Sequence, residues 1–237
     1  MTETAPDTRQ PLVLLSGMLG DHTVWKAVAA ELADVVRPSY VRIDHDDSVA
    51  SMAASVLAES PPRFALAGHS LGGIVALEIL RQALARVTRL ALLNTSAREA
   101  SSTQLESWAA MTKRTKAGAF REVAAELGRY TLPEASRGDV LVARNTAMAE
   151  AVNADGFLRQ LAAQATRPDA RPLLPEVGVP TVVVTGALDH ICPPPLQEEL
   201  AAGIPGARHV VIEQAGHMSP LEAPHQVALA LRSWLAA

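Results

Sequence analysis

A serine set between two glycines is the strongest chemical signal in this 237-residue sequence. Ser70 is the centre of the run Gly-His-Ser-Leu-Gly at 68–72, which follows an apolar segment and precedes a helical pattern. A nucleophilic serine at a strand-turn-helix junction has a strained backbone, and small residues two positions away let the strand and helix approach. Gly68 and Gly72 meet this need, and Gly73 adds room. The pattern predicts Ser70 as a nucleophile, although a serine here could also simply cap the following helix.

A serine hydroxyl is a weak nucleophile at neutral pH, so it needs a base, and the base needs an orienting carboxylate. Asp189 follows the apolar run at 181–185, and His217 follows the last apolar run, at 209–212. Both therefore lie where strands end. We predict that His217 is the general base and that Asp189 orients it. The competing interpretation is a loop aspartate that makes a local turn and a histidine that only packs.

The other candidates fit this geometry less well. After the apolar run at 90–93 the chain has Asn94, Thr95 and Ser96, so no carboxylate stands there and Asp189 is favoured. Five other histidines fall in helix starts, turns or mid-strand, namely His22, His45, His190, His209 and His225. Of these, only His22 and His190 are placed to line a pocket.

Acyl transfer also needs hydrogen-bond donors for the oxyanion that develops on the carbonyl oxygen. One candidate is the backbone N–H of Leu71, the residue after the nucleophile. The turn Ser-Gly-Met-Leu-Gly at 16–20 follows the first apolar run, and Met18 N–H is our second candidate. An ordinary glycine turn before a helix is the alternative.

Short β-branched runs alternate with longer stretches of helical spacing, which predicts an α/β architecture with a mostly parallel sheet flanked by helices. The predicted strands are 12–15, 35–43, 64–67, 90–93, 181–185 and 209–212. The predicted helices that link or follow them are 24–33, 49–59, 72–85, 195–202 and 226–235.

The stretch 97–172 has helical spacing without a strand-like run. We therefore expect a core domain of residues 1–96 and 173–237 and a helical lid (cap) insertion over 97–172, because open α/β sheets hold ligands at the carboxyl ends of strands. A helical layer that only packs on the sheet is the alternative. The predicted substrate-binding residues are Gly17, His69, Trp108, Met111, Tyr130, Met148 and Phe157, and most of the last five are equally consistent with a core. Arg144 and Arg167 are candidates for binding a substrate carboxylate, and the alternative is that both side chains are solvated.

Composition excludes several function classes. A net charge of -4 provides no basic field for nucleic acid. The apolar runs are far shorter than the roughly 20 residues of a membrane helix, and residues 1–11 lack the basic start and apolar stretch of a signal peptide. We expect a cytoplasmic protein, monomeric or homodimeric. Cys192 is the only cysteine, so neither an internal disulfide nor a cysteine metal site is expected.

Together these motifs resemble the α/β-hydrolase fold, in particular its group of esterases, enol-lactonases and pimeloyl-carrier-protein methyl ester esterases. The matching stretches are 16–20, 68–73, 186–193 and 216–224. Two departures stand out: relatives usually have histidine where this chain has Ser16, and the run Ile-Asp-His-Asp-Asp at 43–47 replaces a common turn. The first alters a support of the oxyanion loop, and the second is expected to reshape one pocket wall.

The resemblance implies hydrolysis of a small carboxylic ester through an acyl-enzyme, with neither metal nor organic cofactor. Enol-lactonases and C–C bond hydrolases use the same triad on lactones and ketones, so they stay open as alternatives. A non-catalytic receptor for a small molecule is the alternative from a different class, and only turnover separates it from an esterase.

Overall fold

The computed structural model describes residues 8–237, in which a six-stranded sheet has the order β2-β1-β3-β4-β5-β6. Every neighbouring pair is parallel. The strands are β1 (Gln10–Leu15), β2 (Val36–Tyr40), β3 (Phe64–His69), β4 (Val87–Leu93), β5 (Thr181–Gly186) and β6 (Arg208–Ile212). Residues 1–7, part of the stretch inspected for an export signal, lie outside the described residues.

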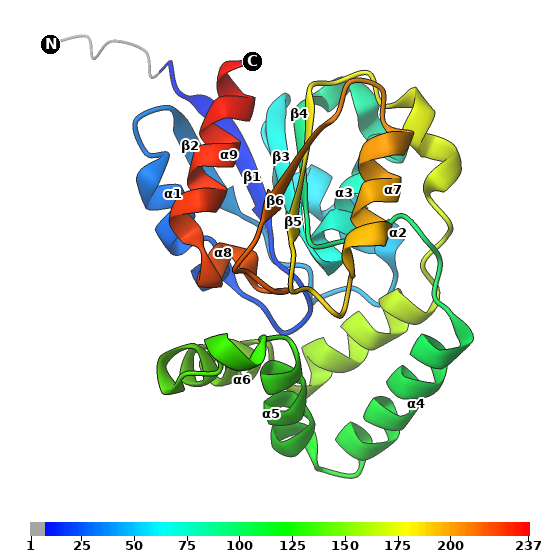
Figure 1. Cartoon of the computed structure of the whole chain (residues 1–237). Coiled ribbons are helices and arrows are strands. Elements are labelled where there is room, and N and C mark those ends of the chain that lie inside the picture. Colours follow the sequence, from blue (N-terminus) through cyan, green and yellow to red (C-terminus); the bar gives the residue numbers. More distant parts are fainter. Residues whose placement is uncertain (1–7) are drawn as a thin grey trace, which may run out of the picture.

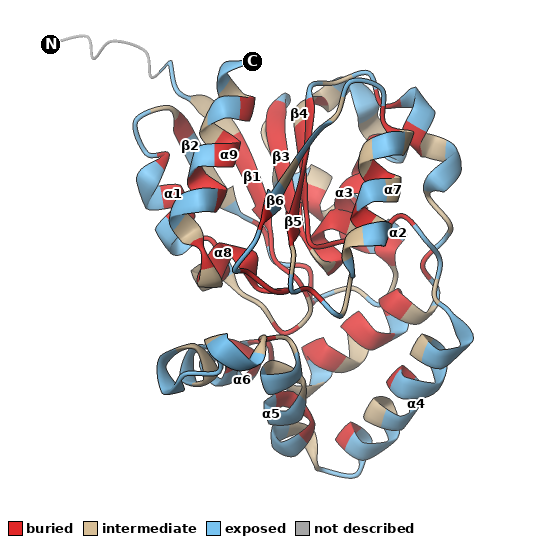
Figure 2. Ribbon diagram, viewed as in Figure 1, coloured by how far each residue is buried: buried red, intermediate tan, exposed pale blue. Residues whose placement is uncertain are grey.

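Helices cover both faces of the sheet, because its central strands are apolar on both sides. In β1, Leu12 and Leu14 pack in one buried cluster with residues of α1 and α9, and Val13 and Leu15 pack in another with residues of α2, α3 and α7. Figure 2 shows the strands as a buried layer between helices whose outer faces are exposed. The helices of this core are α1 (Lys26–Glu31), α2 (Val49–Glu59), α3 (Leu71–Ala83), α7 (Pro194–Gly203), α8 (Ser219–Glu222) and α9 (Pro224–Ala236).

All six predicted strands and all five predicted helices are present; the helix at 49–59 has the predicted ends, and the other elements differ from the prediction at one end or both. The largest difference is at β2, which ends at Tyr40 although a strand was expected as far as residue 43. Val41 and Ile43 are still buried, so the apolar pattern continues after the strand pairing stops. Pro38 lies inside β2, which is an edge strand paired only with β1, and an edge tolerates a residue that has no N–H to donate.

The segment between β4 and β5 contains helices α4 (Ser102–Lys116), α5 (Phe120–Tyr130) and α6 (Asp139–Ala165), and we call it the helical insertion. Figure 1 shows these helices gathered beyond the end of the sheet at which the parallel strands finish. Asn153 has φ 63 and kinks α6, and its side chain accepts hydrogen bonds from the N–H groups of Asp155 and Gly156. Among the described residues, no helix has the length and apolar character needed to cross a bilayer. The insertion therefore lies over the edge of the sheet at which the strands end and the predicted catalytic residues follow them.

Candidate active site

Ser70 lies on a strained turn between β3 and α3. Its φ is 53 and its ψ is -119, a backbone conformation that non-glycine residues rarely adopt. Two hydrogen bonds connect the turn to β4 and the loop that follows it: Ser70 N–H donates to Leu93 O at 2.9 Å, and Thr95 Oγ1 donates to Ser70 O at 2.7 Å. The Ser70 side chain makes no capping hydrogen bond to α3. Its hydroxyl is therefore available for another partner.

The glycines around Ser70 are required by close backbone packing. A Cβ on Gly68 would lie 2.3 Å from Gly72 O, and a Cβ on Gly72 would lie 2.4 Å from Leu15 O. Real Cβ atoms do not approach backbone oxygens so closely, so no larger residue fits without moving β1, β3 or α3. These contacts explain why the serine is flanked by glycine on both sides.

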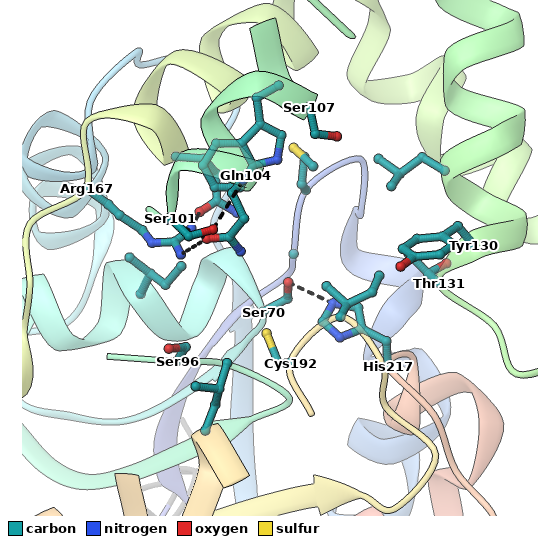
Figure 3. Close-up of a pocket in the computed structure, with 18 of the residues that line it drawn as sticks. Ser70, Ser96, Ser101, Gln104, Ser107, Tyr130, Thr131, Arg167, Cys192 and His217 are labelled. Atoms are coloured by element: carbon teal, nitrogen blue, oxygen red, sulfur yellow. Dashed lines mark hydrogen bonds between the residues drawn. The ribbon is translucent and has the colours of Figure 1, made fainter. Parts of the chain in front are cut away.

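His217 bridges Ser70 and Asp189. Its Nδ1 lies 2.9 Å from Asp189 Oδ2, and its Nε2 lies 2.9 Å from Ser70 Oγ. A carboxylate only accepts hydrogen bonds, so Nδ1–H donates to Asp189 and the unprotonated Nε2 accepts from the Ser70 hydroxyl. Figure 3 shows the Ser70 and His217 side chains joined in this way at the floor of a cavity. The structure therefore brings together all three residues of the predicted triad.

The carboxylate of Asp189 is buried but fully engaged. Its Oδ1 accepts the backbone N–H groups of Ile191 and Cys192, both at 2.9 Å, and its Oδ2 accepts Asn94 Nδ2 at 2.9 Å. Burial alone would raise the pKa of Asp189, but the nearby His217 and these donors outweigh it and lower the pKa. Asp189 is therefore held ionised, as an orienting acid must be.

Asn94 is a supporting residue that we did not predict. It is fully buried at the end of β4 with φ 48, a conformation in which asparagine is enriched. Its Nδ2 donates to Asp189 and to Gly216 O at 3.0 Å, and its Oδ1 accepts the Ser219 hydroxyl. Asn94 thus connects the acid to the loop that carries His217. The available signal was a polar residue directly after a buried strand, which we used only as evidence that no carboxylate stands there.

Two further side chains hold the backbone around His217. His69 Nε2–H donates to His217 O at 2.7 Å. Glu222 accepts the N–H groups on either side of His217, from Gly216 at 3.0 Å and from Met218 at 2.9 Å. Burial, assisted by the neighbouring His217, lowers the pKa of His69 to about 3, so this imidazole stays neutral at physiological pH. Burial also raises the pKa of Glu222, although the two backbone donors oppose the change.

The loop after β1 approaches the nucleophile at Gly17. A Cβ on Gly17 would lie 2.9 Å from Ser70 Cβ, so the loop backbone passes directly beside the serine. Leu19 has φ 59, and its N–H donates to the buried Gln160 Oε1 of α6 at 3.0 Å. Ser16, at the position where a histidine was expected, supports the same loop by donating to Asp21 O at 2.7 Å.

The two predicted oxyanion donors are the backbone N–H groups of Met18 and Leu71. Across residues 8–237, neither of them donates a hydrogen bond to another protein group. Both residues stand beside Ser70, since Leu71 follows it in sequence and Met18 follows Gly17, which contacts it. Both N–H groups are therefore left without a protein acceptor, on residues adjacent to Ser70 and to Gly17.

A cavity of about 460 Å³ opens above Ser70. Its walls come from the core loops and from the helical insertion, and Figure 3 shows Tyr130 and Thr131 on one side and Ser101, Gln104 and Arg167 on the other. The predicted substrate-binding residues that line it are Gly17, His69, Trp108, Met111 and Tyr130, together with the candidates His190 and Arg167. Cys192 also lines it, and burial raises the pKa of its thiol, which therefore stays protonated.

Two predicted pocket residues lie elsewhere. Phe157 is completely buried with Val152 and Leu161 inside the insertion, and Met148 packs in the core cluster shared with α1 and α9. Neither lines the cavity above Ser70, so the expectation is corrected. A core position is the alternative that the sequence left open for most of the lid candidates, because an apolar residue in a helix does not tell which neighbouring layer it faces.

Other candidates are also displaced from the cavity. Arg144 lines a separate surface hollow with Lys26, and the His22 side chain is 61% exposed. The expectation that the turn at 43–47 forms a pocket wall is corrected as well, because none of its residues lines the cavity. Instead it holds the insertion: Asp44 O accepts Arg159 Nε at 2.8 Å, and a Cβ on Gly156 would touch Asp44.

Comparison with known proteins places this arrangement in a family. The alpha/beta hydrolase family matches residues 12–231. A pimeloyl-[acyl-carrier protein] methyl ester esterase of Neisseria meningitidis is 32% identical over 63% of this chain, and the match spans 60% of that relative's length. A thermophilic esterase from Thermogutta terrifontis, solved with malate bound, has a TM-score of 0.87 and 29% identity over 97% of this chain and 90% of its own. The enol-lactonase from Burkholderia xenovorans shares the fold, with a TM-score of 0.87 and 22% identity over 98% of this chain and 93% of its own. The chain belongs to the α/β-hydrolase family.

Proposed function

We propose that this protein is a serine hydrolase that cleaves a small carboxylic ester through an acyl-enzyme. The observation that carries the proposal is the continuous hydrogen-bonded chain from Ser70 Oγ through His217 to the buried Asp189, with distances of 2.9 Å at both links. The esterases named among the similar proteins support an ester as the substrate.

In the first half-reaction, Ser70 Oγ attacks the ester carbonyl and His217 Nε2 takes the hydroxyl proton. The charge on the resulting imidazolium is stabilised by Asp189. The N–H groups of Met18 and Leu71 donate to the oxyanion of the tetrahedral intermediate, a contribution of about 3 kcal/mol for each donor in comparable sites. His217 then gives its proton to the leaving alkoxide, and the acyl group remains on Ser70.

In the second half-reaction, His217 removes a proton from a water molecule that attacks the acyl carbonyl. The intermediate collapses, Ser70 leaves with the proton returned by His217, and the carboxylic acid is released. The support around the imidazole suits this double role: His69 and Glu222 hold its backbone from both sides, so the ring keeps one position in both steps.

We further propose that the helical insertion, residues 97–172, is the lid of this site and selects the acyl group. Its residues Trp108, Met111 and Tyr130 form much of the cavity wall. A largely apolar wall excludes water from the acyl-enzyme and suits an aliphatic or aromatic acyl group. The triad residues come from the core, so chemistry and selectivity are carried by different parts of the chain.

Turnover of p-nitrophenyl esters tests the proposal. Native protein should release more than one p-nitrophenolate per chain, and Ser70→Ala should release none above the uncatalysed rate. Ser55→Ala in α2, away from the cavity, is the matched control and should behave like the native protein. A native protein that binds esters tightly without repeated release would instead be a receptor, and the esterase proposal would be wrong.

A further inference from the structure

One end of the cavity above Ser70 contains a buried cation that the proposed chemistry does not use. Arg167 lies two residues beyond the end of α6 and is only 7% exposed. It lines the same cavity as Ser70 and His217, and its guanidinium lies over the Trp108 ring at 5.2 Å from the centroid. Figure 3 shows Arg167 beside Ser101 and Gln104, on the opposite side of the cavity from Tyr130.

The hydrogen-bond partners of this guanidinium are all neutral oxygens. Its Nε–H donates to Arg98 O at 2.9 Å, and Nη1 donates to Gln164 Oε1 at 2.6 Å. Nη2 donates to Gln104 Oε1 at 3.0 Å and to Glu99 O at 3.4 Å. Among the described residues, one of the two N–H bonds on Nη1 has no partner. Over residues 8–237, no carboxylate forms an ion pair with Arg167.

Among the described residues, Arg167 is the only buried arginine. The exposed arginines Arg98, Arg114 and Arg171 each pair with a carboxylate, whereas the deeply buried Arg167 does not. Glu99 is the only acidic residue among those described as lining the cavity. Glu99 is exposed and forms no ion pair with Arg167. Burial accordingly lowers the pKa of Arg167, a change that only the nearby Cys192 thiol opposes and no carboxylate does. A buried charge without an ionic partner is costly, and such a charge beside a reaction site is well placed to bind a ligand of opposite sign.

We propose that Arg167 binds a free carboxylate of the substrate, so that the preferred substrate is a monoester of a dicarboxylic acid. The inference rests on the proposed ester hydrolysis at Ser70 and names its substrate class. A guanidinium presents planar donors that match a carboxylate, and the unused Nη1–H supplies a charge-assisted hydrogen bond. The apolar lining residues Ile74, Trp108 and Met111 suit the methylene chain that joins the two acid groups.

Arg167 also has a structural use, which the test has to separate from substrate binding. Its bonds to Arg98 O and Glu99 O connect the start of the helical insertion to its end. Loss of those bonds would slow the hydrolysis of every ester by a similar factor. Loss of carboxylate recognition would instead change the ratio of two substrates that differ only in charge.

The experiment compares kcat/KM for monomethyl glutarate, adipate and suberate with kcat/KM for the analogues in which a carboxamide replaces the free carboxylate. Native protein should favour the carboxylate at one chain length by about tenfold or more, mainly through a lower KM, as a charge-assisted hydrogen bond provides. Arg167→Met should bring this ratio to about one, and Arg167→Lys should retain part of it. Arg171→Met, which alters an exposed arginine outside the cavity, should keep the native ratio.

A native ratio near one, or a native-like ratio in Arg167→Met, would overturn the proposal and leave Arg167 with a structural role. If the native protein hydrolyses neither ester, the proposed function fails, and binding then decides the inference. In that case glutarate, adipate or suberate should raise the Tm of the native protein but not of Arg167→Met. The absence of any such shift would overturn the carboxylate site as well.

Discussion

Replacing Asp189 by asparagine tests the orienting carboxylate with almost no change in shape. The two backbone N–H groups of Ile191 and Cys192 point at Oδ1, so the amide oxygen of the new side chain takes that position. The amide NH2 then occupies the place of Oδ2, facing His217 Nδ1. There it donates to Nδ1, so the proton of the imidazole moves to Nε2, which can no longer accept the proton of Ser70.

The expected loss is large in turnover and small in binding. In triads of this kind the same change lowers kcat by roughly 10⁴, about 5 kcal/mol of activation free energy. The new NH2 also faces the NH2 of Asn94, which donates to Gly216 O, and the amide cannot turn over because Asn94 Oδ1 accepts the Ser219 hydroxyl. One buried donor is left without an acceptor, so the free energy of unfolding should fall by about 1–3 kcal/mol.

Steady-state kinetics with a p-nitrophenyl ester should place the effect of Asp189→Asn in kcat, with KM within about threefold of the native value. Asp155→Asn, on an exposed residue of α6, is the control and should keep kcat within about threefold, since surface changes of this kind cost under about 0.5 kcal/mol. A folded Asp189→Asn protein with near-native kcat would refute the reasoning, and the carboxylate would have to come from another residue.

Three further predictions concern the surroundings of the triad. Gly72→Ala places a Cβ 2.4 Å from Leu15 O, so it should abolish turnover and sharply reduce the yield of folded protein, as measured by gel filtration and circular dichroism. Glu222→Gln leaves one of the two N–H groups beside His217 without its acceptor, and urea unfolding should show a loss of about 1–3 kcal/mol, with unchanged stability as the contrary result. The pKa of His69 is lowered to about 3, whereas a histidine of the unfolded chain protonates near pH 6.5, so the stability that neutral His69 contributes is complete above about pH 6.5 and declines toward pH 3. His69→Asn should therefore reduce the fall in unfolding free energy between about pH 7 and pH 4 by roughly 3 kcal/mol, and identical pH profiles for the two proteins would contradict this.

The strand ends explain why the triad could be predicted from sequence. Ser70, Asp189 and His217 each follow an apolar run, and parallel strands place all their carboxyl ends at one edge. Once the runs were identified as strands of one parallel sheet, residues separated by more than a hundred positions had to meet. Helical spacing without a strand-like run likewise predicted the helices between β4 and β5.

The supporting residues could not be predicted in the same way. Asn94 and Asp189 are far apart in sequence, and nothing local to Asn94 indicates that its amide points at a carboxylate. Gln160 reaches the loop after β1 only because the kink at Asn153 redirects the second half of α6. Met148 was expected at the cavity but packs in the core cluster with residues of α1 and α9, because its sequence position does not tell which layer a helical side chain faces.

Covalent capture of the nucleophile tests the central claim most directly. A fluorophosphonate reacts with a serine only where a base activates the hydroxyl, as the contact between His217 Nε2 and Ser70 Oγ at 2.9 Å should do. After incubation, peptide mass spectrometry should find one phosphonylated residue, Ser70, and Ser70→Ala should carry no adduct. An unlabelled native protein, or equal labelling of Ser70→Ala, would contradict the assignment of Ser70 as the nucleophile.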